Sequence, residues 1–314
     1  MLKMAEVSIP YLSGAKIKEV LDYDELISVM ENAFVKYSSG KVVQPVRTVV
    51  KVEKAEGFLG LMPALCEDED ALAVKLVTFY QHNQEKYGLP THNGIVVVFS
   101  VDTGIPKVIM DGEVITTMRT AAASAVASKY LCAPNPRKLA ILGSGVQARS
   151  HFKALSTLYK FEQVTVWSRT FNNAQLLAGE INATACETAE EAVKDADIIV
   201  TVTFSSKPIV QKTWVKPGCH INAVGSCRPD WHEIDPELMR SATVYVDSRA
   251  GAEKESGDII LSEAKVYAEL GEVILGTKDA NRDKTTVFKS LGMAIEDVLS
   301  AKLVCDLLLK TKKS

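Results

Sequence analysis

The apolar run Lys138-Leu-Ala-Ile-Leu142 is followed directly by Gly143-Ser-Gly145-Val-Gln-Ala148. A helical stretch from Arg149 to Tyr159 comes next, and then a second apolar run, Val164-Thr-Val-Trp167. The order strand, glycine turn, helix, strand with G-x-G-x-x-A spacing is typical of a dinucleotide-binding unit. The helix N-terminus offers N–H groups and a positive dipole end to a pyrophosphate. The expected cofactor contacts in this loop are Gly143, Ser144, Gly145, Val146 and Gln147.

The end of the second run indicates which dinucleotide binds. NAD-preferring sites usually place an acidic residue about 20 residues past the glycines, where it holds the ribose 2′-hydroxyl. Here the chain reads Ser168-Arg169-Thr170 and has no acid. The Arg169 guanidinium can meet a 2′-phosphate, with the two hydroxyls and the Asn173 amide as further donors. We therefore expect NADPH; the alternative is a glycine turn that binds nothing.

Length and composition restrict the class of protein. The chain has 314 residues, of which 47% are hydrophobic and 24% charged, as in ordinary globular proteins. A net charge of −3 gives no basic stripe for nucleic acid. No apolar run reaches the roughly 18 residues of a membrane span, and the N-terminus lacks the apolar core of a secretory signal. We expect a cytoplasmic protein with neither a nucleic-acid nor a membrane partner.

Metal-ligand patterns are lacking in the sequence. The six cysteines form no C-x-x-C pair, and the five histidines are scattered. This distribution suits reduced thiols in a cytosolic protein, and no metal site is expected.

Before the glycine loop, apolar runs alternate with turn residues, which predicts a mostly antiparallel sheet in a first domain. A short strand and the start of a helix are expected within residues 1–20, and a helix at 23–37. The expected strands are 46–52, 58–62, 71–80, 94–100 and 106–111. Residues 113–131 predict a long alanine-rich helix between the domains.

From residue 137 to 247, strands and helices alternate as a doubly wound parallel sheet requires. The expected strands are 139–142, 164–167, 198–203, 219–224 and 244–247. Residues 290–310 predict an amphipathic helix that returns to the first domain, with Ser290 as its N-cap. The predicted fold class is α/β, with a Rossmann-type doubly wound sheet inserted in an α+β domain.

Three cations in apolar surroundings are candidates for the substrate site. Arg47 interrupts one predicted strand, Lys75 interrupts another, and Arg119 lies near the start of the alanine-rich helix. Such a set suits an α-carboxylate, because arginine can donate two parallel hydrogen bonds to it. The alternative for each is a surface side chain whose charged end reaches solvent.

Loop residues offer further candidates. His92 lies in a turn between strands, where it can act as an acid or base, contact the cofactor, or simply be exposed. Cys227 and Arg228 follow a strand at its carboxyl end, where ligands collect in open α/β sheets, and Ser205 follows another. The alternative is a solvated loop with an inert thiol.

At these positions the chain resembles the ornithine cyclodeaminase/μ-crystallin family. The matching segments extend over nearly the whole chain and are far more specific than a glycine fingerprint. They are Gln44–Val50, Glu69–Leu72, Lys75–Tyr80, Arg119–Ala122, Gly145–Ala148, Val215–Gly218, Ile221–Gly225, Arg228–Trp231, Glu255–Asp258 and Thr285–Met293.

The resemblance implies a homodimer. It implies a substrate-binding and dimerisation domain of residues 1–118 plus 290–314, and an NADP-binding Rossmann domain of residues 119–289. It further implies NADPH-dependent reduction of cyclic ketimines to cyclic imino acids. Piperideine-2-carboxylate, pyrroline-2-carboxylate and sulfur-containing ring analogues are the implied substrates. Thyroid hormone is an implied ligand in or near the substrate cleft.

The resemblance also assigns site residues. Arg47, Lys75 and Arg119 match positions around the substrate and are the expected catalytic residues, with Lys75 as the hypothetical proton donor. The other implied substrate contacts are Phe58, Cys227, Arg228 and Ser256. The implied cofactor contacts outside the glycine loop are Thr91, His92, Arg119, Ser168, Arg169, Thr170, Asn173, Thr203, Phe204, Ser205, Val224, Ser290 and Leu291.

One departure from the family pattern bears on the reaction. Cyclodeaminase members carry an aspartate, their base for deamination, where this chain has Ser226-Cys227-Arg228. Its absence argues against ornithine cyclodeamination. The μ-crystallin type has serine at the equivalent of Cys227, and a thiol is a weaker donor, so some effect on substrate affinity is expected.

Three hypotheses remain open from the sequence. The favoured one is the ketimine reductase. The second is a non-catalytic protein, either a thyroid hormone-binding protein or a lens structural protein with bound NADPH. The third is an NAD-dependent ornithine cyclodeaminase or amino-acid dehydrogenase, against which Ser168, Arg169 and the missing aspartate count.

Overall fold

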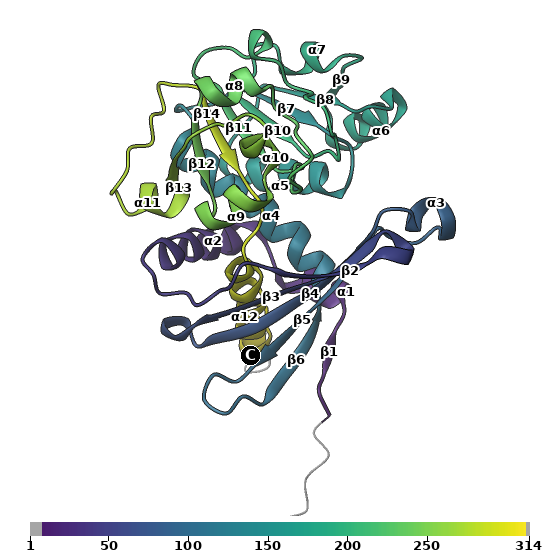
Figure 1. The fold of residues 1–314 in the computed structure, drawn as a ribbon, viewed down its shortest axis with the longest axis vertical. Helices are drawn as coiled ribbons and strands as arrows, with labels where there is room; N and C mark the ends of the chain where they lie inside the picture. Colours follow the sequence, from purple (N-terminus) through teal and green to yellow (C-terminus); the bar gives the residue numbers. More distant parts are fainter. Residues whose placement is uncertain (1–7, 312–314) are drawn as a thin grey trace, which may run out of the picture. The chain divides into compact units, whose positions relative to one another are not determined.

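The computed structural model describes residues 8–311. The chain forms two compact units (Figure 1). Unit 1 comprises Met1–Asp22, Gly40–Thr116 and Ala294–Ser314, and unit 2 comprises Tyr23–Ser39 and Thr117–Met293. Each unit has its own sheet and its own buried core.

In the described part of unit 1, six strands form one sheet in the order β1-β6-β5-β4-β3-β2. All neighbouring strands are antiparallel except β1 and β6, which are parallel. The strands are β1 (Tyr11–Leu12), β2 (Thr48–Val52), β3 (Gly57–Cys66), β4 (Ala71–Tyr80), β5 (His92–Phe99) and β6 (Pro106–Asp111). The helices are α1 (Gly14–Val20), α3 (Asn83–Tyr87) and α12 (Ala294–Thr311). The expectation of a mostly antiparallel sheet is confirmed.

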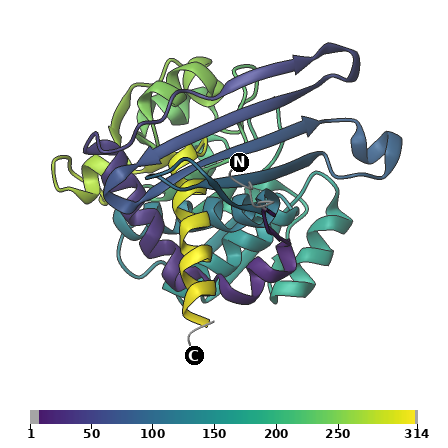
Figure 2. The ribbon, with the colours of Figure 1, turned by 90° about the horizontal axis from the view of Figure 1, so that it is seen from below.

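Side chains on β3 and β4 alternate between the two faces of this sheet, as a strand with one buried face requires. The inner face carries Met62, Ala64, Ala73 and Val96, which are buried, and α12 packs on β3, β4 and β5. Figures 1 and 2 show α12 lying across the strands. The outer face carries Leu61, Pro63, Val74, Leu76 and Val97, which are only partly buried.

In the described part of unit 2, eight strands form a parallel sheet in the order β13-β12-β14-β11-β10-β7-β8-β9. The strands are β7 (Lys138–Leu142), β8 (Gln163–Trp167), β9 (Thr184–Ala185), β10 (Ile198–Thr201), β11 (His220–Ala223), β12 (Thr243–Val246), β13 (Val266–Glu269) and β14 (Thr286–Lys289). The strand order reverses between β7 and β10. The doubly wound α/β fold is confirmed.

Helices cover both faces of the parallel sheet, as strands buried on two sides require. The helices are α2 (Tyr23–Ser38), α4 (Gly112–Leu131, which begins in unit 1), α5 (Val146–Leu158), α6 (Phe171–Ile181), α7 (Ala189–Val193), α8 (Pro236–Ser241), α9 (Arg249–Glu255), α10 (Gly257–Ile260) and α11 (Leu270–Ile274). Residues of α7, α8, α9 and α10 pack with Ala140, Ile199 and Ile221 in one apolar cluster. Opposite that cluster, Phe34 of α2 meets Phe288 edge to face at 6.0 Å.

Several expected elements differ from the structure. The expected strand 198–203 ends at Thr201, because the Thr203 N–H turns to a side-chain carboxylate. The sequence analysis did not predict β14, which is short and ends in a lysine. Ser290 is not an N-cap, since α12 begins at Ala294 and the N–H of Ile295 donates to Oε1 of Gln44.

The compact units differ from the expected domains at Tyr23–Ser39, and also at residues 117–118 and 290–293, all of which belong to unit 2. The helix expected at 23–37 is α2, and it packs against α11 within unit 2 instead of joining the first domain. The short strand and helix expected within residues 1–20 correspond to β1 and α1, and residues 1–7 lie outside the described residues. Within residues 8–311, we find no helix with the length and apolarity of a membrane span.

Candidate functional site

The glycine loop of unit 2 has the geometry that its sequence predicts. Gly143 follows β7 with a φ of +130°, and a Cβ there would lie 2.7 Å from the carbonyl oxygen of Val202. Its N–H donates to the carbonyl of Trp167 at 2.8 Å. Only glycine fits this conformation and this contact without strain. The turn that directs the chain into α5 therefore depends on this residue.

The N-terminus of α5 is open to a ligand. Gly145 is the N-cap and has no side-chain capping bond, and no atom lies within 4 Å of the place where its Cβ would stand. Ala148 is fully buried, so the helix packs closely on the sheet. Oε1 of Gln147 is buried and has no hydrogen-bond partner among the described residues. Free N–H groups beside open space suit a pyrophosphate, so these residues fit a dinucleotide.

Polar contacts hold the glycine loop in place. The Arg149 guanidinium donates to the carbonyl of Ser144 at 2.7 Å and binds both carboxylate oxygens of Glu180 at 2.6 and 2.7 Å. The Ser144 hydroxyl donates to the Ser168 hydroxyl at 2.9 Å, which ties the loop to the end of β8. These contacts fix the loop against β8 and α6.

The end of β8 presents polar side chains without a carboxylate. Arg169, Thr170 and Asn173 are exposed, and the N–H of Asn173 donates to the carbonyl of Thr170 at the start of α6. The structure thus groups the residues predicted to bind a ribose phosphate. A guanidinium with hydroxyl neighbours suits a phosphate better than a diol.

The loops after β10 and β11 carry the next predicted residues. Phe204 is 63% exposed, and its ring meets Trp231 at 5.8 Å. The Arg228 guanidinium lies 5.0 Å from the same indole and 3.4 Å from Asp230. Cys227 is an exposed thiol beside it. The structure therefore brings these two strand-end loops together through Trp231.

Other predicted residues in unit 2 have structural contacts. Thr203 donates its N–H and hydroxyl to the Glu233 carboxylate, and the Ser205 hydroxyl donates to the Lys207 carbonyl. Ser256 is buried and accepts the N–H of Ile259 as the N-cap of α10. Val224 follows β11, and its N–H donates to the carbonyl of Thr201.

Arg119 of α4 is 95% buried beside the segment that follows β14. A Cβ on Gly292, whose φ is +82°, would lie 2.5 Å from Nη1 of Arg119. The Asp247 carboxylate accepts the N–H groups of Leu291 and Gly292 at 2.6 and 2.7 Å. Arg119 and the segment from Ser290 to Gly292 thus lie together, and their expected contact with a cofactor stays a prediction.

In unit 1, Lys75 is a buried cation on the inner face of the sheet. Its side chain is 3% exposed, and Nζ lies 2.6 Å from Oδ2 of Asp297 on α12, whose side chain is fully buried. Nζ also donates to the Thr116 hydroxyl at 3.4 Å. The alternative of a lysine that reaches solvent is therefore wrong. An opposite charge at this distance stabilises the ammonium form.

A row of aromatic side chains lies further along the same strands. Phe58, Phe79 and His92 stand in register on β3, β4 and β5, with ring separations of 5.7 and 4.7 Å. Burial lowers the pKa of His92, and the charge of Lys75 lowers it further. Nδ1 of His92 is 3.3 Å from the Thr91 hydroxyl. The row places an imidazole and two phenyl rings on the inner face of the sheet.

Arg47 differs from its expected position. It lies immediately before β2, which begins at Thr48, so it does not interrupt a strand. Its side chain is partly buried. Arg47 therefore belongs to the loop before the sheet and not to one of its strands.

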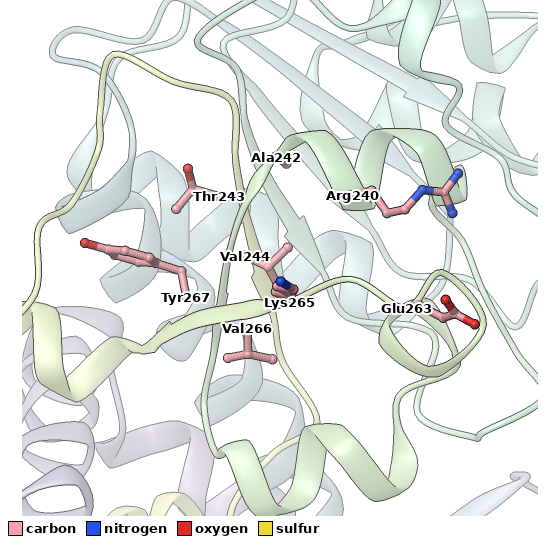
Figure 3. A pocket seen from close by; sticks show the side chains of 8 residues that line it. All are labelled: Arg240, Ala242, Thr243, Val244, Glu263, Lys265, Val266 and Tyr267. Carbon is pink, nitrogen blue, oxygen red and sulfur yellow. The ribbon is translucent and has the colours of Figure 1, made fainter.

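A hollow of about 540 Å³ in unit 2 is not the cofactor site. Figure 3 shows it at the amino ends of β12 and β13, lined by Arg240, Thr243, Lys265 and Tyr267. Ligands of open α/β sheets bind at the carboxyl ends of the strands. Within the described part of the chain, no group of His, Cys, Asp or Glu has the arrangement of a metal site.

Known proteins resemble this chain over most of its length. The sequence model of the ornithine cyclodeaminase/mu-crystallin family matches residues 11–312. The chain belongs to this family. It is 51% identical to the ketimine reductase mu-crystallin of Macropus fuliginosus, over 90% of this chain and 91% of that protein.

Two solved structures share the whole architecture of the family. The Δ1-pyrroline-2-carboxylate reductase of Thermococcus litoralis, in complex with NADH and L-proline, is 36% identical with a TM-score of 0.92. The alignment covers 97% of this chain and 98% of that one. An archaeal alanine dehydrogenase dimer with bound NAD is 32% identical with a TM-score of 0.90, and 97% of each chain is covered.

The sequence analysis did not identify Asp297, whose carboxylate pairs with Lys75, as a site residue. An acid in the first turn of an exposed helix is common, so its charge indicated nothing. The available signal was its position, because Ala294, Ala301 and Val304 lie on the same face of α12 and are buried. An acid among small apolar residues indicates a buried partner.

The Lys75–Asp297 pair predicts a specific loss of stability. Replacing Asp297 with Asn leaves a buried ammonium without its counter-charge, which costs about 3–5 kcal/mol. The control is Asp306→Asn on the same helix, whose carboxylate also lies 2.6 Å from a lysine, Lys302, but is 43% exposed. That change is expected to cost no more than about 1 kcal/mol. Urea unfolding of both variants measures the difference, and equal losses would contradict the prediction.

Proposed function

We propose that this chain catalyses the NADPH-dependent reduction of cyclic ketimines to cyclic imino acids. The substrates are piperideine-2-carboxylate, pyrroline-2-carboxylate and sulfur-containing ring analogues. The observation that carries the proposal is Lys75, a buried ammonium paired with Asp297 at 2.6 Å. The names of two relatives, at 51% and 36% identity, describe reductases of a ketimine and of pyrroline-2-carboxylate, and they support the same chemistry.

The chemistry follows from the substrate. A cyclic ketimine has an electrophilic C=N carbon next to a carboxylate, and protonation of the nitrogen makes that carbon a better hydride acceptor. Lys75 donates the proton to the nitrogen. The neutral amine that results stands beside the Asp297 carboxylate, which favours its reprotonation for the next turnover. Lys75 therefore supplies the proton, and Asp297 favours its return to the amine.

Two arginines bind the substrate carboxylate. Arg47 and Arg119 each offer a planar fork that matches a carboxylate. Arg119 is buried against the backbone of Gly292, so its guanidinium has little freedom. An immobile fork fixes the direction of the carboxylate, and orientation of this kind contributes much of the rate enhancement in favourable systems.

NADPH is the proposed cofactor, and the residues that hold it lie along the carboxyl edge of the unit 2 sheet. Gly145 and the first turn of α5 bind the pyrophosphate, and Arg169 with Ser168 and Thr170 binds the 2′-phosphate. The bound nicotinamide supplies a hydride. The structural relatives carry NADH and NAD, so the preference for the phosphorylated form rests on Arg169 and the missing acid.

A homodimer is proposed on the outer face of the unit 1 sheet. Leu61, Val74, Leu76 and Val97 form an apolar surface there that is only partly buried, while α12 covers the opposite face. We propose that a second copy of this chain covers this surface, because one structural relative is described as a dimer. Burying such a surface between two copies removes it from water.

A second ligand is proposed on the aromatic row. Phe58, Phe79 and His92 present a broad aromatic surface on the same sheet face as Lys75. Such a surface suits the rings of thyroid hormone, whose carboxylate would take the place of the ketimine carboxylate. The hormone then acts as an inhibitor. A non-catalytic hormone-binding or lens structural role would retain this binding without turnover.

The reaction is tested with a small panel of cyclic ketimines and both cofactors. We expect turnover with piperideine-2-carboxylate and NADPH. Lys75→Met should lower kcat by a factor of about 100 or more, because the proton donor is lost, while NADPH still binds. Lys86→Met, at an exposed lysine of α3, is the matched control and should retain full activity. Unchanged turnover in Lys75→Met would remove the lysine from the mechanism.

Cofactor preference is tested at Arg169. Arg169→Ala should raise the Kd for NADPH about tenfold or more and leave the Kd for NADH unchanged, because only the 2′-phosphate contact is lost. Arg137→Ala, at a side chain that is 73% exposed, is the control. Calorimetric titration of the wild-type protein and both variants with each cofactor measures all six constants. Equal affinity of the wild-type protein for the two cofactors would refute the assignment.

Hormone binding is tested in the same assay. Thyroid hormone should raise the apparent KM for the ketimine without lowering kcat, because both ligands use the same cations. Inhibition that lowers kcat and leaves KM unchanged would instead indicate a separate hormone site.

The dimer is tested by sedimentation equilibrium. The wild-type chain should sediment as a dimer, and Val74→Lys should shift it to monomer, because a charge would be buried at the centre of the apolar face. Leu309→Lys, at a residue of α12 that is 59% exposed, should leave the dimer intact. A monomeric wild-type protein would overturn the proposal.

A further inference from the structure

The Glu233 carboxylate is fully buried at the carboxyl edge of the parallel sheet and has no part in the proposed reaction. Oε1 accepts the N–H and the hydroxyl of Thr203, each at 2.6 Å. Oε2 accepts the N–H of Gly225 and the hydroxyl of Thr201, each at 2.8 Å. One side chain therefore holds the backbone of two loops, the one after β10 and the one after β11.

Two further buried charges surround this carboxylate. Lys289, the last residue of β14, lies 3.3 Å from Asp258 of α10, and both side chains are fully buried. Asp258 also accepts the N–H groups of Glu233 and Ile234 at 2.8 and 3.0 Å. Burial raises the pKa of Glu233, while the charge of Lys289 opposes that rise. The printed contacts of Glu233 with β10 and with the loops after β10 and β11 come from hydroxyl and N–H donors, and Lys289 supplies a positive charge that opposes part of the charge of the two acids.

The geometry requires a carboxylate and a glycine. Each oxygen of Glu233 accepts a backbone N–H, so a glutamine, which has one acceptor oxygen, would turn its NH₂ group toward one of those donors. At Gly225 a Cβ would lie 2.1 Å from the carbonyl oxygen of Thr203 and 2.5 Å from Oε1 of Glu233. The two loops are therefore packed backbone to backbone around the carboxylate.

The strand order indicates which half of a dinucleotide these two loops would contact. β7 ends at the glycine loop, with β8 on one side and β10 followed by β11 on the other. A dinucleotide in such a sheet lies across the carboxyl ends at the point where strand order reverses, with its pyrophosphate on the glycine loop. The adenosine half then lies beside β8, and the nicotinamide half lies beside the ends of β10 and β11.

We propose that Glu233 is a positioning residue that sets the two strand-end loops for the nicotinamide half of the cofactor. It acts through the backbone of Thr203 and Gly225 and does not touch the cofactor. The inference rests on the proposed cofactor role of unit 2. It predicts that loss of the carboxylate weakens binding of the nicotinamide half alone, since other contacts hold the glycine loop and Ser168 at the end of β8.

The test compares a whole cofactor with a fragment that lacks nicotinamide. Glu233→Gln should raise the Kd for NADPH about tenfold, as expected for loss of one charge-assisted hydrogen bond, and leave the Kd for 2′-phospho-ADP-ribose unchanged. NADH and ADP-ribose form the second pair of ligands. The control is Glu237→Gln on α8, whose side chain is 66% exposed, and it should alter no Kd. Calorimetric titration gives every constant.

A milder variant covers the case in which Glu233→Gln does not fold. Thr201→Val keeps the volume of a buried side chain and removes one hydroxyl donor to Glu233. This variant should raise the Kd for NADPH severalfold and leave the Kd for 2′-phospho-ADP-ribose unchanged. Equal weakening of cofactor and fragment would show a general structural role and overturn the inference, as would no change in either. If the wild-type protein binds neither cofactor, the proposed function fails, and this inference fails with it.

Discussion

The carboxyl edge of the parallel sheet depends on buried carboxylates that accept backbone N–H groups. Parallel strands all end at the same edge, and the loops that leave them have N–H donors with no strand partner. Glu233 accepts donors from the loops after β10 and β11, and Asp247 accepts the N–H groups of Ser248, Leu291 and Gly292. An ionised acceptor makes strong hydrogen bonds, so these acids hold the edge at which the candidate cofactor residues gather.

Two buried ion pairs, one in each unit, join elements that are distant in the sequence. Lys75 of β4 meets Asp297 of α12 in unit 1, and Lys289 of β14 meets Asp258 of α10 in unit 2. Buried pairs contribute little net stability compared with apolar residues of the same size, but removing one partner is costly. In the proposed reaction the first pair holds the proton that is transferred. In the second pair, the charge of Lys289 opposes part of the charge of Asp258 and Glu233.

How much the sequence predicts depends on how local the cause is. The turn at Gly143 is part of a local motif, and turn residues separate the apolar runs of unit 1, so the glycine turn and the antiparallel sheet were both predicted. Asp297 and Glu233 were missed because their partners are set by the fold. Ser290 was expected to begin a helix, but Asp247 holds the next two residues, and Gly292 has a φ of +82°, so the helix starts later. Local spacing can indicate that such a residue is buried, as it does for Asp297, but it does not identify the partner.

The last strand in sequence is not at an edge of its sheet. β14 lies between β12 and β11, and α12, which follows it, covers the inner face of the other sheet. During synthesis, β11 and β12 have emerged from the ribosome long before the strand that separates them. Each unit therefore needs a segment that follows its other strands in the chain, β14 for the sheet of unit 2 and α12 for the sheet of unit 1. A chain that has reached only β13 leaves a gap in one sheet and an uncovered face on the other, and both expose apolar surface.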